Sequence, residues 1–250
     1  KLGQHFLNNP RVIARIADSM GVESGAWVAE IGPGTGALTT ELLERGLHVL
    51  AVEMDERCYP VLEELSLRFG GRLTLVQGDA LDLASWLPRL PQGSAICGNL
   101  PYNVGTEIVT RLLLAPEART SRQTFMLQKE VVQRLTAKAA DDHWGRLGVL
   151  VHLLADARKL FDVGPGNFTP PPKVMSSIVQ LTPLPGPRYP VDMAKLDTLL
   201  RAAFGQRRKM LRGSLKGLLT EEQIAACGVA PTARPEELTT KALCTLAGLL

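Results

Sequence analysis

The sequence predicts an α/β protein whose doubly wound sheet is mostly parallel, ends in an antiparallel hairpin and precedes a small all-helical domain. Three observations lead to this fold class. Apolar runs alternate with helical patterns between Val12 and Gln128, two further strand-like runs follow residue 145, and only helical patterns follow Gly186. Strands that alternate with helices are typical of parallel sheets covered on both faces.

Five short apolar runs form the expected parallel part of the sheet. Helical patterns such as Ala37–Gly46, which Gly46 is expected to end, and Glu107–Glu117 lie between them. The predicted strands are Trp27–Ile31, His48–Glu53, Leu73–Gly78, Ser94–Gly98 and Thr124–Gln128.

The hairpin is expected from the runs Ala157–Val163 and Lys173–Leu181, which only a Pro/Gly-rich loop separates. This loop is too short for a helical crossover, so the two strands are predicted to be antiparallel. The stretch Thr182–Pro190 then reads as a linker. It divides the chain into an expected sheet domain, 1–185, and an expected helical domain, 186–250.

Composition excludes several classes of protein. Of the 250 residues, 45% are hydrophobic and 21% are charged, and no apolar run approaches the roughly 20 residues of a membrane span. The four cysteines are far apart and do not cluster with histidines, so we expect neither a metal site nor disulfides. We expect a monomeric, cytoplasmic protein without a membrane partner, although the sequence begins at Lys1 without an initiator Met and says nothing of residues upstream.

The stretch EIGPGTGALT, Glu30 to Thr39, follows one predicted strand and opens a helix. Its glycines let the backbone turn sharply and let a ligand approach closely. Glu53 lies 21 residues after Gly32, where its carboxylate can accept hydrogen bonds from both hydroxyls of a ribose. The pattern predicts a nucleoside-containing cofactor, and because the spacing also fits the dinucleotide fingerprint it leaves NAD open.

Two acidic residues favour S-adenosylmethionine over a dinucleotide. Glu30 directly precedes the glycine loop, where its negative charge suits the cationic methionyl end of that cofactor better than a pyrophosphate. Asp79, in the stretch GDAL after the third predicted strand, borders the same crevice of a doubly wound sheet. Its carboxylate can accept a hydrogen bond from the adenine amino group, although an Asp at such a place is more often a helix cap.

The stretch NLPY, Asn99 to Tyr102, follows the fourth predicted strand. An exocyclic adenine amine is a poor nucleophile because its lone pair is delocalised, and an oxygen acceptor on each N–H would free that pair. The Asn99 side-chain oxygen and the Leu100 carbonyl are two such acceptors. Pro101 fixes the turn, and Tyr102 offers a ring on which a flipped-out base can stack. The stretch predicts methyl transfer to an adenine amine or, on the plainer interpretation, a proline turn with a half-buried tyrosine.

These motifs resemble those of the small-subunit (16S-type) ribosomal RNA adenine N6,N6-dimethyltransferases, near relatives of the erythromycin-resistance rRNA methyltransferases. The resemblance runs along essentially the whole chain and includes GQHFL (Gly3–Leu7), VEMD, NFTPPPKVMSS (Asn167–Ser177) and AAFGQRRKMLRGSL (Ala202–Leu215). It implies a Rossmann-like class I methyltransferase sheet. His5 stands where many members carry Asn, so the resemblance supports a cofactor contact by the backbone of this residue and does not extend to its side chain. The residues implied to contact the cofactor or line its site are His5, Leu7, Gly32, Gly34, Glu53, Asp79, Ala80 and Asn99.

The resemblance also implies that Asn167–Ser177 is a second base-stacking loop. Phe168 precedes three prolines that hold the chain extended and rigid, so its ring can close over the other face of a base on Tyr102. From the residues alone, a core Phe that anchors the loop is the favoured interpretation.

Charge is unevenly distributed along the chain. Residues 185–250 contain ten Lys/Arg against six Asp/Glu, whereas residues 1–184 contain 18 against 19. No acid lies between Arg201 and Gly217, and on a helix residues 208, 212 and 216 would share a face that can follow RNA phosphates. A salt-bridged or solvated helix surface is the alternative. The expected RNA-binding residues are Arg207, Arg208, Lys209, Arg212 and Lys216.

The function expected from these features is S-adenosylmethionine-dependent dimethylation of adenine amines in rRNA. The resemblance implies two adjacent adenines near the 3′ end of small-subunit rRNA within an assembling small ribosomal subunit. Three alternatives remain open: a resistance-type methyltransferase of large-subunit rRNA, an NAD-dependent oxidoreductase, and a noncatalytic ribosome-assembly or transcription factor.

Overall fold

The computed structural model describes residues 4–206 and 208–250. The chain divides into two compact units, each with its own hydrophobic core. The first unit contains the chain up to Val132 together with Ala157–Pro183, and the second contains Gln133–Asp156 and Leu184–Leu250.

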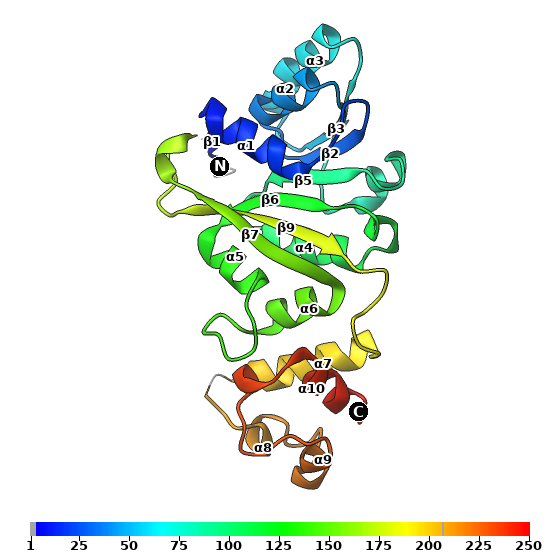
Figure 1. Cartoon of the computed structure of the whole chain (residues 1–250), viewed down its shortest axis with the longest axis vertical. Helices are drawn as coiled ribbons and strands as arrows, with labels where there is room; N and C mark the ends of the chain where they lie inside the picture. The colour runs from blue at the N-terminus through cyan, green and yellow to red at the C-terminus, as the bar shows by residue number, and fades with distance from the viewer. Residues whose placement is uncertain (1–3, 207) are drawn as a thin grey trace. The chain divides into compact units, whose positions relative to one another are not determined.

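The first unit is built on a seven-stranded sheet (Figure 1). β2 pairs in parallel with β3 and β5, β3 with β4, and β5 with β6, whereas β9 is antiparallel to β6. The predicted doubly wound, mostly parallel sheet is confirmed. The strands, in the order β4-β3-β2-β5-β6-β9-β7, are β2 (Trp27–Ile31), β3 (His48–Glu53), β4 (Leu73–Gln77), β5 (Ala95–Asn99), β6 (Gln123–Gln128), β7 (Ala155–Val163) and β9 (Ser176–Pro183).

β7 and β9 are the predicted hairpin and lie side by side at one end of the sheet. Ser177 bonds to Asp162, and further along β9 Gln180 accepts from Arg158, so the two strands run in opposite directions. β9 begins at Ser176 rather than at the predicted Lys173. Ser176 lies opposite Gln128, the last residue of β6, and α5 begins at Lys129, so the residues before Ser176 have no strand of this sheet to pair with on that side.

Helices bury both faces of the sheet. α1, α2 and α3 pack through Ile16, Leu42 and Leu62 on the face that carries Val49 and Ala51. Leu50 and Val52 of the same strand point to the other face and are also buried, as a parallel sheet with two covered faces requires. The helices are α1 (Pro10–Met20), α2 (Ala37–Glu44), α3 (Tyr59–Arg68), α4 (Gly105–Leu114) and α5 (Lys129–Leu135), and two short strands, β1 (Phe6–Leu7) and β8 (Phe168–Thr169), form a separate antiparallel pair.

The second unit is helical and contains a segment that the sequence placed with the sheet. The predicted domains, 1–185 and 186–250, differ from the two units in Gln133–Asp156 and in residues 184 and 185. Trp144 and Leu153 of this segment are buried in one cluster with Leu199 and Leu243, and the Trp144 indole donates to the Leu238 carbonyl. The helices are α6 (Arg146–Leu154), α7 (Met193–Phe204), α8 (Leu211–Ser214), α9 (Glu221–Ala226) and α10 (Thr240–Ala247).

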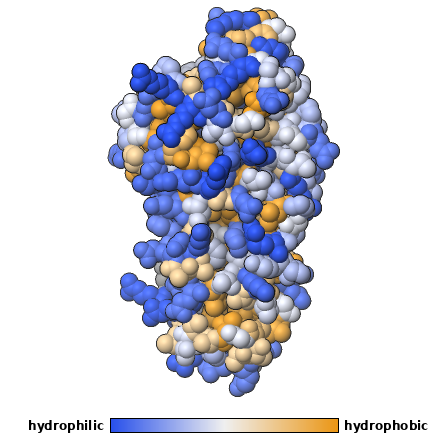
Figure 2. Space-filling model, viewed as in Figure 1, coloured by the Kyte–Doolittle hydropathy of each residue, from blue (hydrophilic) through white to orange (hydrophobic). Residues whose placement is uncertain are grey.

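On the face drawn in Figure 2, hydrophilic residues dominate and hydrophobic residues form separate patches. Among the described residues, every helix is too short or too polar to cross a bilayer. All four cysteines carry free thiols.

Candidate active site

A pocket opens in the first unit where β2, β3, β4 and β5 end at the same edge of the sheet. β2 lies between β3 and β5, so the pocket occupies the point where the strand order reverses, which is the usual ligand site of such sheets. All twelve residues that the sequence nominated for cofactor or catalysis line it: His5, Leu7, Gly32, Gly34, Glu53, Asp79, Ala80, Asn99, Leu100, Pro101, Tyr102 and Phe168.

The glycine loop between β2 and α2 needs glycine for two reasons. Gly32 and Gly34 have φ of 68° and 59°, which L residues with side chains rarely adopt. A Cβ on Gly34 would also lie 2.9 Å from two ring carbons of Phe6. The loop can therefore pack against the N-terminal strand only with glycine at this position.

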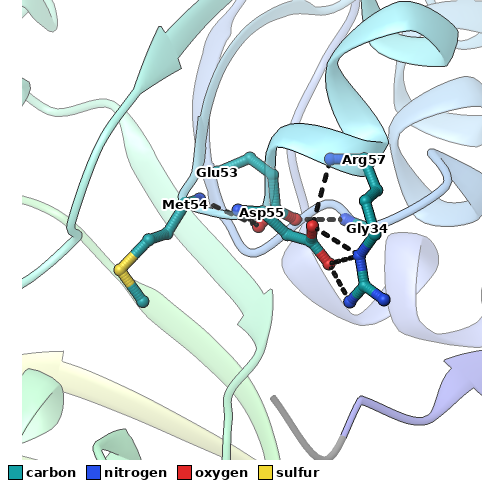
Figure 3. Close-up of polar contacts among 5 residues, drawn as sticks. All are labelled: Gly34, Glu53, Met54, Asp55 and Arg57. Carbon is teal, nitrogen blue, oxygen red and sulfur yellow. Dashed lines mark hydrogen bonds and ion pairs between the residues drawn. The ribbon is translucent and has the colours of Figure 1, made fainter. Parts of the chain in front are cut away.

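Glu53 ends β3 with a carboxylate held by backbone N–H groups (Figure 3). Its Oε1 accepts from Gly34 at 2.9 Å, and its Oε2 accepts from Met54 at 2.9 Å and Asp55 at 3.0 Å. A carboxylate has about four lone-pair positions, so these three bonds leave room for about one more donor, at Oε1. Arg57 forms an ion pair with Asp55 rather than with Glu53, as the same figure shows.

Glu30, the fourth residue of β2, is a second carboxyl group of the pocket and is 2% exposed. The Thr39 hydroxyl on α2 donates to its Oε1. Burial raises the pKa of Glu30 to about 7; the Thr39 hydrogen bond opposes this rise, and the charge of Glu53 adds to it. Burial, with a contribution from Glu30, also holds the pKa of Cys97 on β5 well above its ordinary value.

Asp79 and Ala80 form the pocket wall beyond β4. Asp79 is exposed, and its Oδ1 accepts the N–H of Leu81 at 2.9 Å. The carbonyl of Ala80 accepts from the indole of the buried Trp86 at 2.9 Å. Asp79 thus has the turn-capping contact that the plainer interpretation expects, and its second oxygen stays available to a ligand.

Asn99 and Leu100 present two oxygen atoms without donors. The Asn99 side-chain nitrogen donates to the His5 carbonyl at 3.1 Å, which fixes the amide and leaves its oxygen as an acceptor. The Leu100 N–H donates to the Met126 carbonyl, which anchors the turn on β6. Among the described residues, no hydrogen-bond donor meets the Asn99 Oδ1 or the Leu100 carbonyl.

Tyr102 follows these acceptors and is 41% exposed. Its ring lies 5.5 Å from that of His5, at an interplanar angle of 34°. The His5 Nδ1–H donates to the Pro170 carbonyl at 2.8 Å, so the His5 side chain joins the Tyr102 turn to the second loop. Burial raises the pKa of the Tyr102 phenol, so this group is neutral at physiological pH.

Phe168 is 4% exposed and belongs to the core cluster of the first unit. It pairs with Leu7 through β8 and β1, and it also forms part of the pocket wall. This is the place of the anchoring Phe that the residues alone favoured. Contact with a base is possible only from inside the pocket.

Gln4 is a pocket residue that the sequence analysis missed. Its side-chain Oε1 is buried and has no hydrogen-bond partner among the described residues. A buried acceptor without a donor is costly, so a ligand that donates there would be favoured. The signal was available, because Gln4 directly precedes His5 in GQHFL.

The basic stretch lies in the second unit, and its predicted helix is wrong. α7 ends at Phe204 and α8 covers only Leu211–Ser214, because Arg208 and Gly217 have φ of 74° and 91°. Leu211 and Leu215 nevertheless point into the core. Arg208, Lys209, Arg212 and Lys216 are exposed and form no ion pair within the described residues, and Arg207 lies outside those residues.

The described residues contain no group of His, Cys, Asp or Glu that could hold a metal ion. The pocket contains three carboxyl groups, those of Glu30, Glu53 and Asp79, and it also contains the two oxygen acceptors of Asn99 and Leu100 and the exposed ring of Tyr102.

Comparison with known proteins agrees with this site. Residues 1–250 match the family model described as ribosomal RNA adenine dimethylase. The chain is 45% identical to the ribosomal RNA small subunit methyltransferase A of Ruegeria sp. (strain TM1040), over 98% of this chain and 89% of that protein. It is also 45% identical to the protein of the same name from Allorhizobium ampelinum, over 100% of this chain and 91% of that protein.

Solved structures agree as well. A dimethyladenosine transferase from Plasmodium falciparum superposes with a TM-score of 0.79 and 26% identity, over 97% of this chain and 96% of that one. The structure of the 23S rRNA methyltransferase ErmE superposes with a TM-score of 0.73 and 26% sequence identity, over 98% of this chain and 99% of that one. With a full-length family match and relatives at this identity, the chain belongs to the ribosomal RNA adenine dimethylase family.

Proposed function

We propose that this chain is a methyltransferase that uses S-adenosylmethionine to dimethylate the amines of two adjacent adenines near the 3′ end of small-subunit rRNA. One observation carries the proposal. An Asn99 amide that His5 holds in one orientation, and the Leu100 carbonyl beside it, offer two free acceptors at the edge of an acidic pocket.

The pocket residues fit S-adenosylmethionine better than a dinucleotide. Glu30, Glu53 and Asp79 line the pocket, and no Lys or Arg does so within the described chain. Three carboxyl groups disfavour the anionic pyrophosphate of NAD and favour a ligand with positive charge. S-adenosylmethionine supplies an electrophilic methyl group when bound.

Each acid has a distinct role in this proposal. Glu53 accepts from the ribose, using the capacity that its three backbone bonds leave at Oε1. Glu30 faces the cationic methionyl end, and Asp79 accepts from the adenine amino group. His5 contacts the cofactor through its backbone, and Leu7 forms part of the pocket wall. The small residues Gly32, Gly34 and Ala80 let the cofactor approach the chain closely.

Asn99 and Leu100 activate the target amine. Each oxygen accepts one N–H of the adenine, which draws the nitrogen toward tetrahedral geometry and frees its lone pair for the methyl group. Pro101 holds the turn, and Tyr102 stacks on the flipped base. No strong base is needed, because the alkylated amine loses its proton readily. Phe168 closes the inner wall of the base site.

RNA contact is assigned to the 186–250 region. Exposed, unpaired cations suit phosphate binding, which depends on charge and on RNA shape rather than on one helix face. The contacts are those of Arg207, Arg208, Lys209, Arg212 and Lys216. We further propose a monomer that acts in the cytoplasm on an assembling small subunit.

The relatives favour the small subunit over the large one. Proteins named for the small subunit are 45% identical to this chain, whereas ErmE, named for 23S rRNA, is 26% identical.

Mass spectrometry of the product tests the proposal. The protein is incubated with S-adenosylmethionine and small subunits that lack dimethyladenine, and the rRNA is digested and its adenines quantified. We expect two dimethyladenines per subunit with wild type and almost none with Asn99→Ala. Methylation of large-subunit RNA instead would support the resistance-type alternative, and no methylation of either would reject the enzyme.

A further inference from the structure

Glu30 is a buried carboxyl group for which the described residues supply no cationic partner. It is 2% exposed, lies on the pocket wall at the end of β2 and accepts one hydrogen bond, from Thr39 on α2. A charge at this depth is costly unless another charge compensates it.

The groups around Glu30 make ionisation harder. Glu53 on β3 adds negative charge, and the thiol of Cys97 on β5 is neutral. The other titratable side chains on the pocket wall are His5, Asp79 and Tyr102. Of the described residues that line the pocket, none is Lys or Arg.

Burial accordingly raises the pKa of Glu30 to about 7, despite the opposing Thr39 bond. At neutral pH the free protein is therefore divided about equally between the carboxylic acid and the carboxylate. Both the carboxylic acid and the carboxylate can accept a hydrogen bond from the Thr39 hydroxyl, so this bond does not determine which form is present.

We propose that Glu30 exchanges its proton for the positive charge of the cofactor. The carboxylic acid of the free pocket gives up its O–H proton to solvent as the cationic cofactor binds, and the resulting carboxylate pairs with that cation. No other bond forms or breaks. This inference rests on S-adenosylmethionine as the cofactor, and it assigns to Glu30 a role in binding rather than in the methyl transfer itself.

Two consequences can be measured. Because cofactor binding and proton loss are linked, cofactor affinity rises by about tenfold from pH 6 to pH 8 and then levels off. At pH 7, each binding event releases about half a proton.

Calorimetry measures the released protons directly. Wild type is titrated with S-adenosylmethionine at pH 7 in phosphate and in Tris, whose ionisation heats differ, and the dependence of the binding heat on the buffer gives the number of protons. We expect about 0.5 for wild type and about zero for Glu30→Gln. Glu23→Gln is the matched control, since it makes the same Glu-to-Gln change on an exposed residue outside the pocket, and it should keep the wild-type value.

Thr39→Val gives a second, graded variant. It removes the bond that holds the pKa of Glu30 down, so its proton release at pH 8 should exceed that of wild type. Binding without proton release in wild type, equal release in Glu30→Gln, or no increase in Thr39→Val would each overturn the inference and leave the cofactor assignment intact. Absence of any binding to wild type would instead reject the proposed cofactor.

Discussion

Two walls of one pocket are built in different ways. On the glycine-loop wall, Glu53 is 4% exposed and three backbone N–H groups hold its carboxylate. On the NLPY wall, Tyr102 is 41% exposed and the Asn99 oxygen faces no donor of the described chain. Backbone donors thus hold the Glu53 carboxylate and leave it about one acceptor position, whereas the NLPY wall keeps both of its oxygen acceptors for a base brought by a larger partner.

The largest effect should come from the open wall. Asn99→Ala removes one acceptor that acts mainly when the nitrogen becomes tetrahedral, so the single-turnover rate should fall by about 10²–10³-fold. Cofactor affinity should change little. If cofactor affinity fell as much as the rate, Asn99 would not act on the target base alone. A rate near that of wild type would mean that Asn99 takes no part in the methyl transfer.

The second methylation sharpens this test. After the first transfer only one N–H remains, so the two acceptors cannot both be used. The monomethyl-to-dimethyl step should therefore respond to Asn99→Ala differently from the first step, which a time course of unmodified, monomethyl and dimethyl adenine measures.

The buried carboxyl group of Glu30 should make the stability of the free protein depend on pH. A folded-state pKa raised from 4.5 to about 7 means that the native state binds more protons than the unfolded state between these values. The free energy of unfolding should therefore fall as pH rises from about 4.5 to 7, by about 3 kcal/mol in total, and Glu30→Gln should lack this component. Urea unfolding of both proteins at several pH values gives the difference, and parallel curves would contradict the assignment.

Glu53→Ala should affect the cofactor wall alone. Loss of the ribose hydrogen bond to this charged group should weaken cofactor binding by about 1.5–3 kcal/mol. RNA binding measured without cofactor should not change. Unchanged cofactor affinity in calorimetry would exclude Glu53 as the ribose ligand.

Tyr102→Ala should weaken RNA binding by about 1–3 kcal/mol through lost stacking, with a smaller effect on the rate at saturating RNA. Tyr102→Phe keeps the ring and should be nearly silent. Equal damage from both changes would mean that the hydroxyl matters and that stacking is the wrong role.

The smallest effect per residue is expected in the second unit. Neutralising Arg207, Arg208 and Arg212 should flatten the salt dependence of RNA binding by roughly 0.7–0.9 in log–log slope per lost contact. Cofactor affinity and the stacking contribution of Tyr102 should not change. An unchanged slope would make the basic stretch structural.

The parts that could be predicted from sequence depend on local signals. Apolar runs with intervening helical patterns predicted the strands of the parallel sheet, and the glycines with Glu53 and Asn99 predicted the pocket, because the ends of parallel strands share one edge. The hydrogen bond from His5 to Pro170 joins residues 165 positions apart, for which the sequence carries no local signal.

The differences between the prediction and the structure have two origins. Trp144 packs with helices far along the chain, so the grouping of Gln133–Asp156 with the second unit was not visible in the local pattern. The helix expected across the basic stretch overlooked Gly205, Gly213 and Gly217, which weaken a helix interior.

The pairing of β1 with β8 has a consequence for the order in which the molecule is made. The Asn8–Thr169 bond beside this pair joins residues 161 positions apart, so closing this contact costs the entropy of a very long loop. During synthesis the N-terminal strand leaves the ribosome early, but its partner emerges only after two thirds of the chain. The β2–β5 core can fold before then, whereas the pocket lacks part of its wall until β8 arrives. A nascent chain that stops before Phe168 also lacks β9, so it should carry only the folded parallel part of the sheet, β4-β3-β2-β5-β6, and no competent site.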